Sequence, residues 1–510
     1  MNDCLLAIDL GSTNLKSVIF DLKGKVISKF TTNTVTDTIE TESGNMVFCN
    51  HNLLWEKVVE IIKGALKSKD NKYVIKAIAV SGAADDSVPI DKHGNVLYPF
   101  ISWKCSRTSS QFQWINSQLS NEVIRNVTGI NLLPINSICR MMWIKENKPE
   151  IYDKTDKWLL MEDFINFKLT NEISADYSLS QSTQLLDISS KQWSKKLFNE
   201  VGLEINQMCS LKNSGEIVGQ ITDEAADLTG LQKGIPVVQG GWDLQCASFA
   251  CGSFNKGTVV DIIGTWETIN ISNINLVKND KLFRYGYNVG FNVLHDYYSY
   301  FAYVVCGEMI EWMLNRFCEI DSSIEKNRYE LLNNLTHDSK VGSNGIFFLP
   351  HMYGSFYPKV DANSRGAYIG LRGNSTLKDI ARATIEGLNY QFYNMILGLN
   401  GCDIIDIKKI VVAGGATKNK FWMQNKADIC GQSIEIADID EECAQGTALL
   451  AGIGVGLYRN KDEAYKAIYR VSNVYEPVLE NYNRYQELYV VYEKIYDSLC
   501  EINSKIDLRR

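Results

Sequence analysis

The sequence of 510 residues has few of the features that mark secreted, membrane-bound or nucleic-acid-binding proteins. No apolar run approaches the roughly 18 residues that span a membrane. A strand pattern begins within four residues of the first methionine, which leaves no room for a signal peptide. Lysine and arginine are scattered and the net charge is −8, which argues against nucleic acid and anionic membranes as partners. We therefore expect a cytoplasmic protein.

Metal-binding and phosphate-binding motifs are also missing. The thirteen cysteines form no Cys-x-x-Cys pair and the five histidines stand apart, so no Cys/His metal site is expected. The cysteines are expected to be free thiols in a reducing compartment. There is no Gly-x-x-x-x-Gly-Lys-Ser/Thr motif, and no Gly-x-Gly-x-x-Gly motif follows a strand. P-loop and Rossmann proteins are therefore excluded.

What is present is an ordinary globular composition over a length that predicts two large domains. Hydrophobic residues make up 45% of the chain and charged residues 22%. Apolar spacing predicts a strand over 26–32, a helix over 52–67 and a strand over 75–80. It also predicts helices over 243–251 and 477–500, the last of them for packing. Alternating strands and helices indicate an α/β sheet, whose ligands usually bind where the strands end.

The stretch from Leu5 to Lys16 predicts two strands joined by a tight turn of Gly11, Ser12, Thr13 and Asn14. Backbone N–H groups and hydroxyls of such a turn can bind an anion. Asp9 ends the first strand, where its carboxylate would repel a bare phosphate. This favours a divalent cation between the two, held through water. The alternative is an ordinary hairpin in which Gly11 and Asn14 serve only the turn.

Two later stretches follow the same plan. Val259 to Ile269 contains an apolar strand, the turn Gly264-Thr265 and a second apolar strand, which favours a duplicated domain with a nucleotide between its halves. A strand over 410–413 runs into Gly414, Gly415 and Ala416, followed by a helix from about Asn419 to Cys430. Because glycine has no Cβ, a planar base can approach this backbone closely.

Asp243 follows the turn Gly240-Gly241 at the start of a predicted helix. A carboxylate in a cleft at this position can accept the proton of a hydroxyl group. The alternative is that Asp243 only caps the helix.

Further motifs carry a family resemblance that extends from about residue 4 to residue 470. Trp103 and Arg107 fit a Trp-x-Asp-x-Arg motif in which Cys105 replaces the aspartate. The segment 366–386 fits a second signature throughout, whereas 137–147 fits the first signature less well, with Arg140 in place of lysine. The sequence resembles the sugar kinases of the actin, hexokinase and heat-shock ATPase superfamily, and within them the FGGY carbohydrate kinases.

The resemblance implies two ribonuclease-H-like α/β domains with a cleft between them. Residues 1–242 would bind the sugar and carry the first phosphate hairpin, and residues 243–510 would bind ATP and end in a helical extension. It implies Asp243 as general base, and Asp9 remains the expected magnesium residue. Asp85, the neighbour of Asp86, is expected only to be solvated. The implied sugar contacts are Asp86, Trp103, Arg107, Trp242 and Gln245. The implied ATP contacts are Gly11, Ser12, Thr13, Asn14, Gly264, Thr265, Gly414, Gly415, Ala416 and Asn419.

The substrate implied first is L-fuculose, phosphorylated at its C1 hydroxyl, because 102–108, Asp86 and Gly264-Thr265-Trp266-Glu267 resemble L-fuculokinases. The segment 82–86 departs from that pattern, and the C-terminal helix is similar to that of autoinducer-2 kinases. D-xylulose, D-ribulose, L-rhamnulose, polyols and autoinducer-2 therefore stay open, as does a homodimer. The rival class is a catalytically silent ATP-binding regulator, because fold does not fix function.

Overall fold

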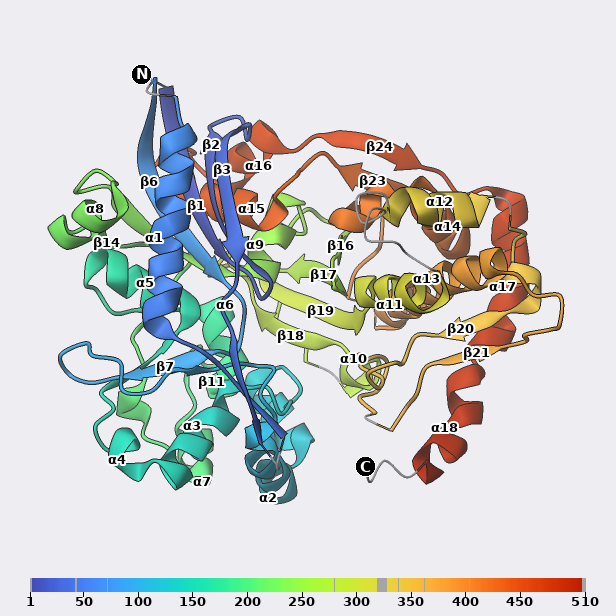
Figure 1. The fold of residues 1–510 in the computed structure, drawn as a ribbon, viewed down its shortest axis with the longest axis horizontal. Coiled ribbons are helices and arrows are strands. Elements are labelled where there is room, and N and C mark those ends of the chain that lie inside the picture. The colour runs from blue at the N-terminus through green and yellow to red at the C-terminus, as the bar shows by residue number, and fades with distance from the viewer. Residues whose placement is uncertain are drawn as a thin grey trace.

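The computed structural model describes all residues except 1, 42–43, 71, 279, 319–327, 338, 362, 403 and 507–510. Two mixed sheets organise the two halves of the molecule, which lie side by side in Figure 1. The first sheet has the order β14 (Ile217–Gln220), β15 (Pro236–Trp242), β6 (Tyr73–Gly82), β1 (Asn2–Leu10), β2 (Asn14–Asp21) and β3 (Val26–Asn33). The second has the order β18 (Asn288–Phe291), β19 (Tyr298–Val305), β17 (Trp266–Asn273), β16 (Thr258–Ile263), β22 (Lys409–Ala413), β23 (Ile434–Ala437) and β24 (Val471–Tyr475).

Both sheets are built on the same plan. In the first, β1 pairs antiparallel with β2 and parallel with β6. In the second, β16 pairs antiparallel with β17 and parallel with β22. Each plan places a tight turn, Gly11–Thr13 or Gly264–Thr265, beside the end of a parallel strand. The two-domain α/β fold expected from the sequence is confirmed.

Helices cover these sheets. In the first half they include α1 (His51–Ser68), α2 (Ser109–Thr128), α3 (Ser137–Asn147), α5 (Met161–Thr170), α6 (Tyr177–Ser180), α7 (Lys195–Val201) and α8 (Asp223–Thr229). In the second they include α11 (Gly307–Phe317), α12 (Arg328–His337), α13 (Leu377–Gly401) and α14 (Lys420–Cys430). Short strands complete the first half: β4 (Asp37–Thr41), β5 (Gly44–Cys49), β7 (Ser87–Ile90), β8 (Phe100–Ile101) and β9 (Lys157–Leu160). A short hairpin of β20 (Phe347–Leu349) and β21 (Ala367–Ile369) lies in the second half. Along the described chain, no helix is both long and apolar enough to cross a membrane.

Helix α1 shows how the sequence fixes these elements. Its cap is Asn50, whose side chain accepts hydrogen bonds from the backbone N–H groups of Asn52 and Leu53. Leu54, Val58 and Ile61 recur at helical spacing and are buried in the core of the first sheet. The helix expected over 52–67 therefore differs from the observed one by a single residue at each end.

The prediction of one continuous C-terminal helix over 477–500 is wrong. The structure has two helices instead, α17 (Leu479–Tyr492) and α18 (Ile495–Lys505), and no glycine or proline marks the break at 493–494. Helix α17 packs on α13 and α14. The hydroxyl of Tyr485 donates to Glu386, 2.7 Å away.

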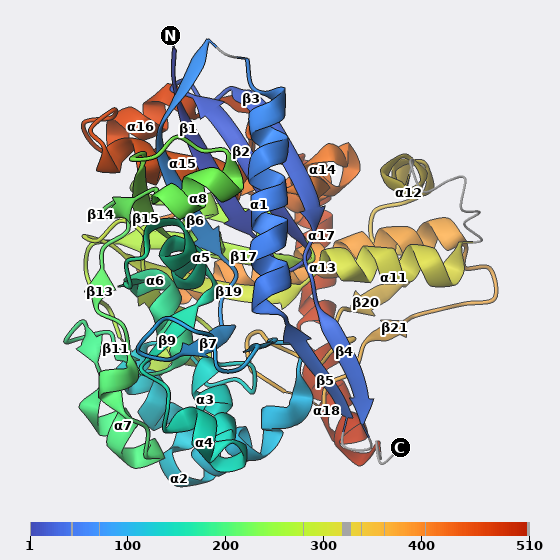
Figure 2. The ribbon, with the colours of Figure 1, turned by 60° about the vertical axis from the view of Figure 1, so that its left-hand side comes forward.

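Two helices cross between the halves, α9 (Asp243–Ala250) and α15 (Glu442–Gly454). Although α15 lies late in the sequence, it packs on β1 and β6 of the first sheet, as Figures 1 and 2 both show. At the crossing, a Cβ atom on Gly446 would lie 1.8 Å from the carbonyl oxygen of Cys246. The absence of a side chain at Gly446 therefore sets the spacing of the two helices.

We expect Gly446→Ala to destabilise the protein by about 1–3 kcal/mol, because a backbone carbonyl cannot move aside as a side chain can. Thermal unfolding measures the effect. Gly373→Ala is the matched control, since a Cβ atom there would meet nothing within 4 Å. Equal melting temperatures for the two variants would contradict this account of the crossing.

Candidate active site

Three parallel strands of the first sheet end side by side. Asp9 in β1 lies opposite Ser81 in β6, and Ser81 lies opposite Gly241 in β15. The chain that follows these strands carries the turn Gly11–Asn14, the pair Asp85-Asp86, and Asp243. The carboxylates singled out from the sequence therefore gather at one sheet edge, where α/β proteins bind their ligands.

Asp9 is buried, and its Oδ1 accepts a hydrogen bond from the thiol of Cys443, 3.2 Å away at the start of α15. Burial raises the pKa of Asp9, an effect that the nearby charge of Lys16 opposes. Lys16 Nζ bonds to Glu441, 2.7 Å away, and Glu441 binds Lys29 at the same distance. These contacts tie the first turn to α15.

Asp243 is the first residue of α9, and the capping position belongs to Trp242, whose side chain makes no capping bond. Capping therefore does not explain Asp243. Its Oδ1 accepts a hydrogen bond from the backbone N–H of Leu244, 2.6 Å away. Burial, together with the charge of Asp9, raises the pKa of Asp243 to about 7. This value suits a general base that acts near neutral pH.

The backbone before Asp243 is tightly held. Glu162 accepts hydrogen bonds from the N–H of Gly240, 2.9 Å away, and from the amide of Gln239, 2.8 Å away. The N–H of Trp242 donates to the hydroxyl of Ser178, 2.9 Å away. A Cβ atom on Gly240 would lie 1.8 Å from the carbonyl oxygen of Val80. Asp243 thus follows a rigid turn.

Asp86 and Trp103 are brought together. Oδ1 of Asp86 accepts a hydrogen bond from the backbone N–H of Trp103, 2.6 Å away. The guanidinium of Arg140 lies 3.9 Å from the same oxygen. Burial raises the pKa of Asp86 to about 6, and the charge of Arg140 opposes the rise.

The expectation that Asp85 is only solvated is wrong. Asp85 is buried, its Oδ1 accepts a hydrogen bond from Asn136, 2.9 Å away, and its backbone carbonyl accepts one from Ser137, 2.6 Å away. Burial raises the pKa of Asp85 to about 7. A signal was available in Arg140, because an arginine among apolar residues of a helix indicates a buried polar partner.

The other predicted sugar contacts lie in different places. The guanidinium of Arg107 stacks 5.0 Å from the ring centroids of both Phe48 and Trp143, and its Nε donates to Cys105. The Trp242 ring packs on Phe301 of the second half, with ring centroids 5.3 Å apart. Gln245 is not brought to this site. It is fully buried, and its side-chain oxygen accepts a hydrogen bond from Asn270 in β17, 3.2 Å away.

Two of the predicted nucleotide turns lie together in the second half. Ile262 in β16 pairs with Ala413 in β22, so the turns after these strands are neighbours. Gly414 has a φ of +100°, which favours glycine, and a Cβ atom there would lie 2.3 Å from the carbonyl oxygen of Ile263. Gly264, Thr265 and Gly415 are exposed, so a ligand can reach them, as it can Ser12 and Thr13 of the first turn.

Asn419 and Ala416 are less accessible. Asn419 is fully buried and caps α14, since its Oδ1 accepts a hydrogen bond from the N–H of Trp422, 2.8 Å away. Ala416 is also buried. The glycines of this turn are therefore better placed to contact a nucleotide base than the side chains of Asn419 and Ala416 are.

The residues at the first turn fit a magnesium ion. Among the described side chains, no three His, Cys, Asp or Glu residues form a metal-binding group. Mg²⁺ usually keeps several waters and is bound by one or two carboxylates together with substrate phosphates. Asp9, directly before an exposed turn of hydroxyls and N–H groups, meets that requirement without a closed cage of protein ligands.

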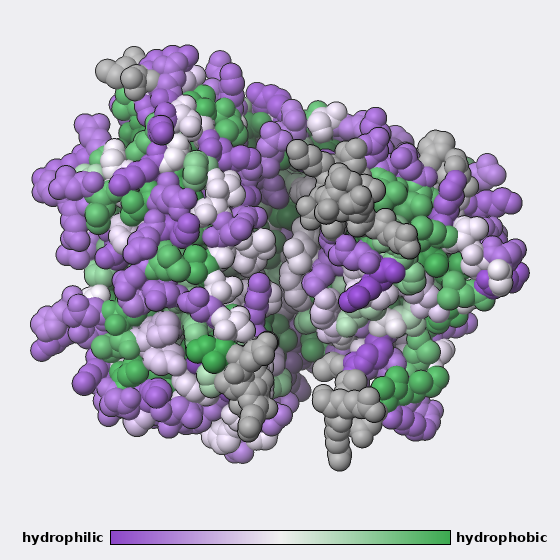
Figure 3. Space-filling model, in the orientation of Figure 1, coloured by the Kyte–Doolittle hydropathy of each residue, from purple (hydrophilic) through white to green (hydrophobic). Residues whose placement is uncertain are grey.

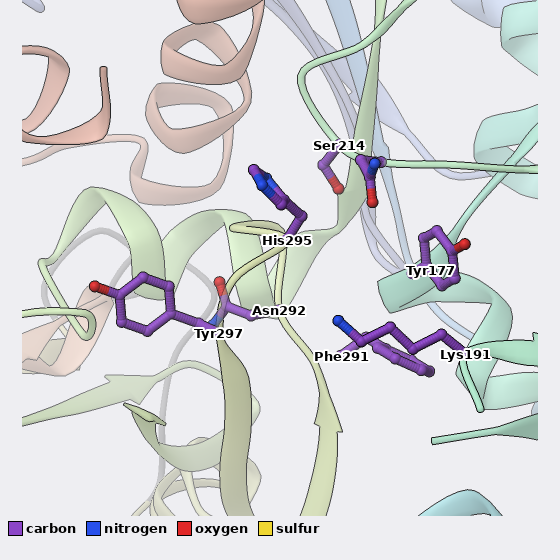
Figure 4. Close-up of a pocket in the computed structure, with 8 residues that line it drawn as sticks. Tyr177, Lys191, Ser214, Phe291, Asn292, His295 and Tyr297 are labelled. Carbon is purple, nitrogen blue, oxygen red and sulfur yellow. The ribbon is translucent and has the colours of Figure 1, made fainter. Parts of the chain in front are cut away.

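The space-filling view shows a groove between the two halves (Figure 3). A separate small pocket of about 50 Å³ also lies between residues of the two halves. Its lining includes Tyr177, Lys191, Asn292 and His295 (Figure 4), and none of the predicted site residues belongs to it. It is therefore not the candidate active site.

Together the two sheets and the ligand edge define a two-domain α/β protein with a fold of the actin and hexokinase type. The chain matches the N-terminal domain of the FGGY family of carbohydrate kinases over residues 4–250 and the C-terminal domain over residues 259–455. It therefore belongs to the FGGY family, and it is an ATP-dependent sugar kinase.

Particular relatives differ in substrate. The chain is 28% identical to a xylulose kinase of Staphylococcus epidermidis, over 99% of both chains. It is 25% identical to the L-fuculokinase of Escherichia coli, over 94% of this chain and 98% of the relative. The solved xylulose kinase of Rhodospirillum rubrum has the same fold, with a TM-score of 0.88 at 19% identity, and the match covers 98% of this chain and all of the other.

Proposed function

We propose that this kinase transfers the γ-phosphoryl group of ATP to a hydroxyl of a ketose, with L-fuculose as the first candidate. The observation that carries the proposal is that β1, β6 and β15 end side by side, with Asp9 at the end of β1, Asp86 in the loop after β6, and Asp243 directly after β15. In this proposal the groove between the halves holds the sugar and the nucleotide, and its closure excludes water.

Asp243 accepts the proton of the sugar hydroxyl as the hydroxyl oxygen forms its bond to the γ-phosphorus. The bond between that phosphorus and the bridging oxygen breaks, and ADP leaves with its electron pair. Positioning carries most of the catalysis in such a transfer. The hydrogen bond from Leu244 and the rigid Gly240-Gly241 turn supply it for Asp243.

The nucleotide contacts come from the exposed turns. The N–H groups and hydroxyls of Gly11, Ser12, Thr13 and Asn14, with Gly264 and Thr265, bind the phosphates, and Gly414 and Gly415 lie under the adenosine. Asp9 is the residue that would hold Mg²⁺ through water. The ion, when bound, neutralises charge on the β and γ phosphates.

Asp86 selects the sugar. Because its carboxylate is buried, a sugar that leaves it unpaired costs about 1–3 kcal/mol or more in binding. We expect kcat/KM to be highest for L-fuculose among L-fuculose, D-xylulose, D-ribulose and L-rhamnulose, and Asp86→Asn to change the ranking. A coupled assay of ADP release measures both. An unchanged ranking would remove Asp86 from the recognition of the sugar.

D-xylulose is the second candidate, because the relatives from S. epidermidis and R. rubrum are named xylulose kinases. The motif at 102–108 and the turn Gly264-Thr265-Trp266-Glu267 favour L-fuculose instead. If D-xylulose gives the highest kcat/KM in the same panel, the chain is a xylulose kinase and the assignment of Asp243 stands. Nucleotide binding without turnover of any sugar would support a silent regulator.

The pH dependence tests Asp243 separately. Its pKa is raised to about 7, so the carboxylate is protonated, and inactive as a base, below that pH. We expect kcat/KM to fall about tenfold per pH unit below pH 7 and to level off above it. Asp86→Asn should keep this acid limb, whereas the residual activity of Asp243→Asn should lack it. If the acid limb of the kcat/KM profile persists in Asp243→Asn, that limb reflects the titration of another group.

A further inference from the structure

One buried cation lies beneath the two nucleotide turns of the second half. Lys426 in α14 is fully buried, and its Nζ lies 2.7 Å from Asp261 Oδ2 in β16. The same Nζ bonds to Glu267 Oε1 in β17. It also lies 3.5 Å from the centroid of the Phe392 ring. Because charges lose their hydration in a protein interior, such a cluster persists only when its members are well paired.

The cluster connects the strands and the helix that flank the two nucleotide turns. Asp261 and Glu267 lie in the two strands that flank the turn Gly264–Thr265, and Lys426 lies in the helix that follows the turn Gly414–Ala416. The side chain of Lys426 therefore joins two parts of the site. One is the hairpin with the turn Gly264–Thr265, called here the phosphate turn. The other is the helix after the turn Gly414–Ala416, called here the base turn. None of the three side chains is more than 1% exposed, so none of them can touch a nucleotide.

The phosphate turn is fixed from a second direction as well. The N–H of Cys306 donates to the carbonyl of Thr265, and the N–H of Gly307 donates to the carbonyl of Gly264, each at 3.1 Å. The carbonyls are thereby held on the side of α11, while the turn itself stays exposed. Lys426 fixes the strands below this turn, so the two sets of contacts together set its orientation.

The members of the cluster depend on one another. Burial raises the pKa of Asp261 to about 8, an effect that the charge of Lys426 opposes and the neighbouring Glu267 adds to. The removal of one partner would leave an uncompensated charge in the protein interior.

We propose that Lys426, Asp261 and Glu267 are positioning residues that hold the phosphate turn in register with the base turn. Their loss should weaken ATP use more than sugar use. This inference rests on the proposed contacts of Gly264 and Thr265 with the nucleotide. It concerns the placement of ATP, so it predicts a higher KM for ATP with a nearly unchanged KM for the sugar, and not a general loss of activity.

The test compares Lys426→Met with Arg382→Met. Arg382 also forms a buried ion pair in the second half, with Nε 2.7 Å from Glu386. It joins α13 to α17 and stacks on Phe421 of α14, 4.8 Å from the ring centroid, but it pairs with neither strand beside the turn Gly264–Thr265. We expect both variants to lower the melting temperature. Only Lys426→Met should raise KM for ATP, by roughly tenfold or more, because small misplacements are costly in transfer reactions. KM for the sugar should stay within about twofold in both.

Equal changes in KM for ATP in the two variants would overturn the inference, because the cluster would then be a general stabilising element. If Lys426→Met does not fold, the neutral triple variant Lys426→Met/Asp261→Asn/Glu267→Gln replaces it. That variant should fold and still show the raised KM for ATP. Wild-type ATP kinetics in the triple variant would also overturn the inference.

Gly264→Val separates this inference from the nucleotide site on which it rests. A Cβ atom at Gly264 would meet only the carbonyl oxygen of Trp266, 3.8 Å away, so the variant should fold while its side chain obstructs the turn. Calorimetric binding of MgADP should be lost. If binding persists in Gly264→Val, the proposed phosphate turn is wrong and the inference falls with it. If binding is lost there but unchanged in Lys426→Met, only the positioning role is wrong.

Discussion

Replacement of Asp243 by alanine is expected to lower kcat by roughly 10² to 10⁴, the usual contribution of a positioned general base. Two observations set the expectation. Asp243 stands at the edge where β1, β6 and β15 end together. Its raised pKa of about 7 makes it a stronger base than an ordinary carboxylate while leaving much of it ionised at neutral pH.

Fold and nucleotide binding should survive this change. Within the described part of the chain, the Asp243 side chain accepts one hydrogen bond, from the N–H of its neighbour Leu244, and Trp242 occupies the capping position. Melting temperature and calorimetric MgADP binding measure both. Activity within about threefold of wild type would show that Asp243 is not the base.

Asp163→Asn is the matched control, because Asp163 is a buried aspartate whose carboxylate binds the backbone. Its Oδ2 accepts a hydrogen bond from the N–H of Leu160, 2.9 Å away, at the start of α5. We expect a lower melting temperature and an unchanged kcat for this variant. A similar fall of kcat in both variants would mean that the loss reflects stability and not proton transfer.

The sequence predicted the parts of this site that depend on strand ends. Apolar runs over 5–10, 75–80 and 410–413 define buried strands, and polar or glycine residues follow each run directly. These patterns placed Asp9 at the end of one strand and Asp86 shortly after another, at the edge where ligands bind. The strand that precedes Asp243, β15, was not predicted. The family resemblance added the order in which the turns occur.

The sequence patterns did not predict contacts between residues that are far apart in the chain. Cys443 touches Asp9 across 434 positions, and Lys16 touches Glu441 across 425. Both depend on the packing of α15 against the first sheet, which no local pattern encodes. Gln245 lies two residues from Asp243, yet the helical turn directs it to Asn270, so proximity in sequence was a poor guide to its partner.

The burial of Asp85 likewise depends on distant residues. Asn136, 51 positions later, donates to the Asp85 carboxyl group, and Arg140, 55 positions later, donates to the backbone carbonyl of Asp85. The short segment 82–86 alone suggests only a polar loop. The break between α17 and α18 has no local signal either, because neither glycine nor proline occurs there.

Asp9→Asn is expected to weaken activation by Mg²⁺ by about 10- to 100-fold, the range seen when a residue that acts on a metal through an intermediary is lost. The amide keeps the size of the side chain and can still accept the bond from Cys443, so the fold should be retained. The change removes the negative charge of the carboxylate, which Mg²⁺ requires. A titration of activity with Mg²⁺ at saturating sugar measures the effect, with KM for the sugar nearly unchanged.

Asp3→Asn controls for the strand itself, because Asp3 lies at the other end of β1, where it forms a long ion pair of 3.5 Å with Lys76. Its Mg²⁺ dependence should match wild type. The shift should also be absent in Cys443→Ser, which keeps a donor to Asp9. If the concentration of Mg²⁺ for half activity is the same in Asp9→Asn and wild type, the carboxylate at the end of β1 does not serve the metal. The first turn would then bind phosphate through its N–H groups and hydroxyls alone.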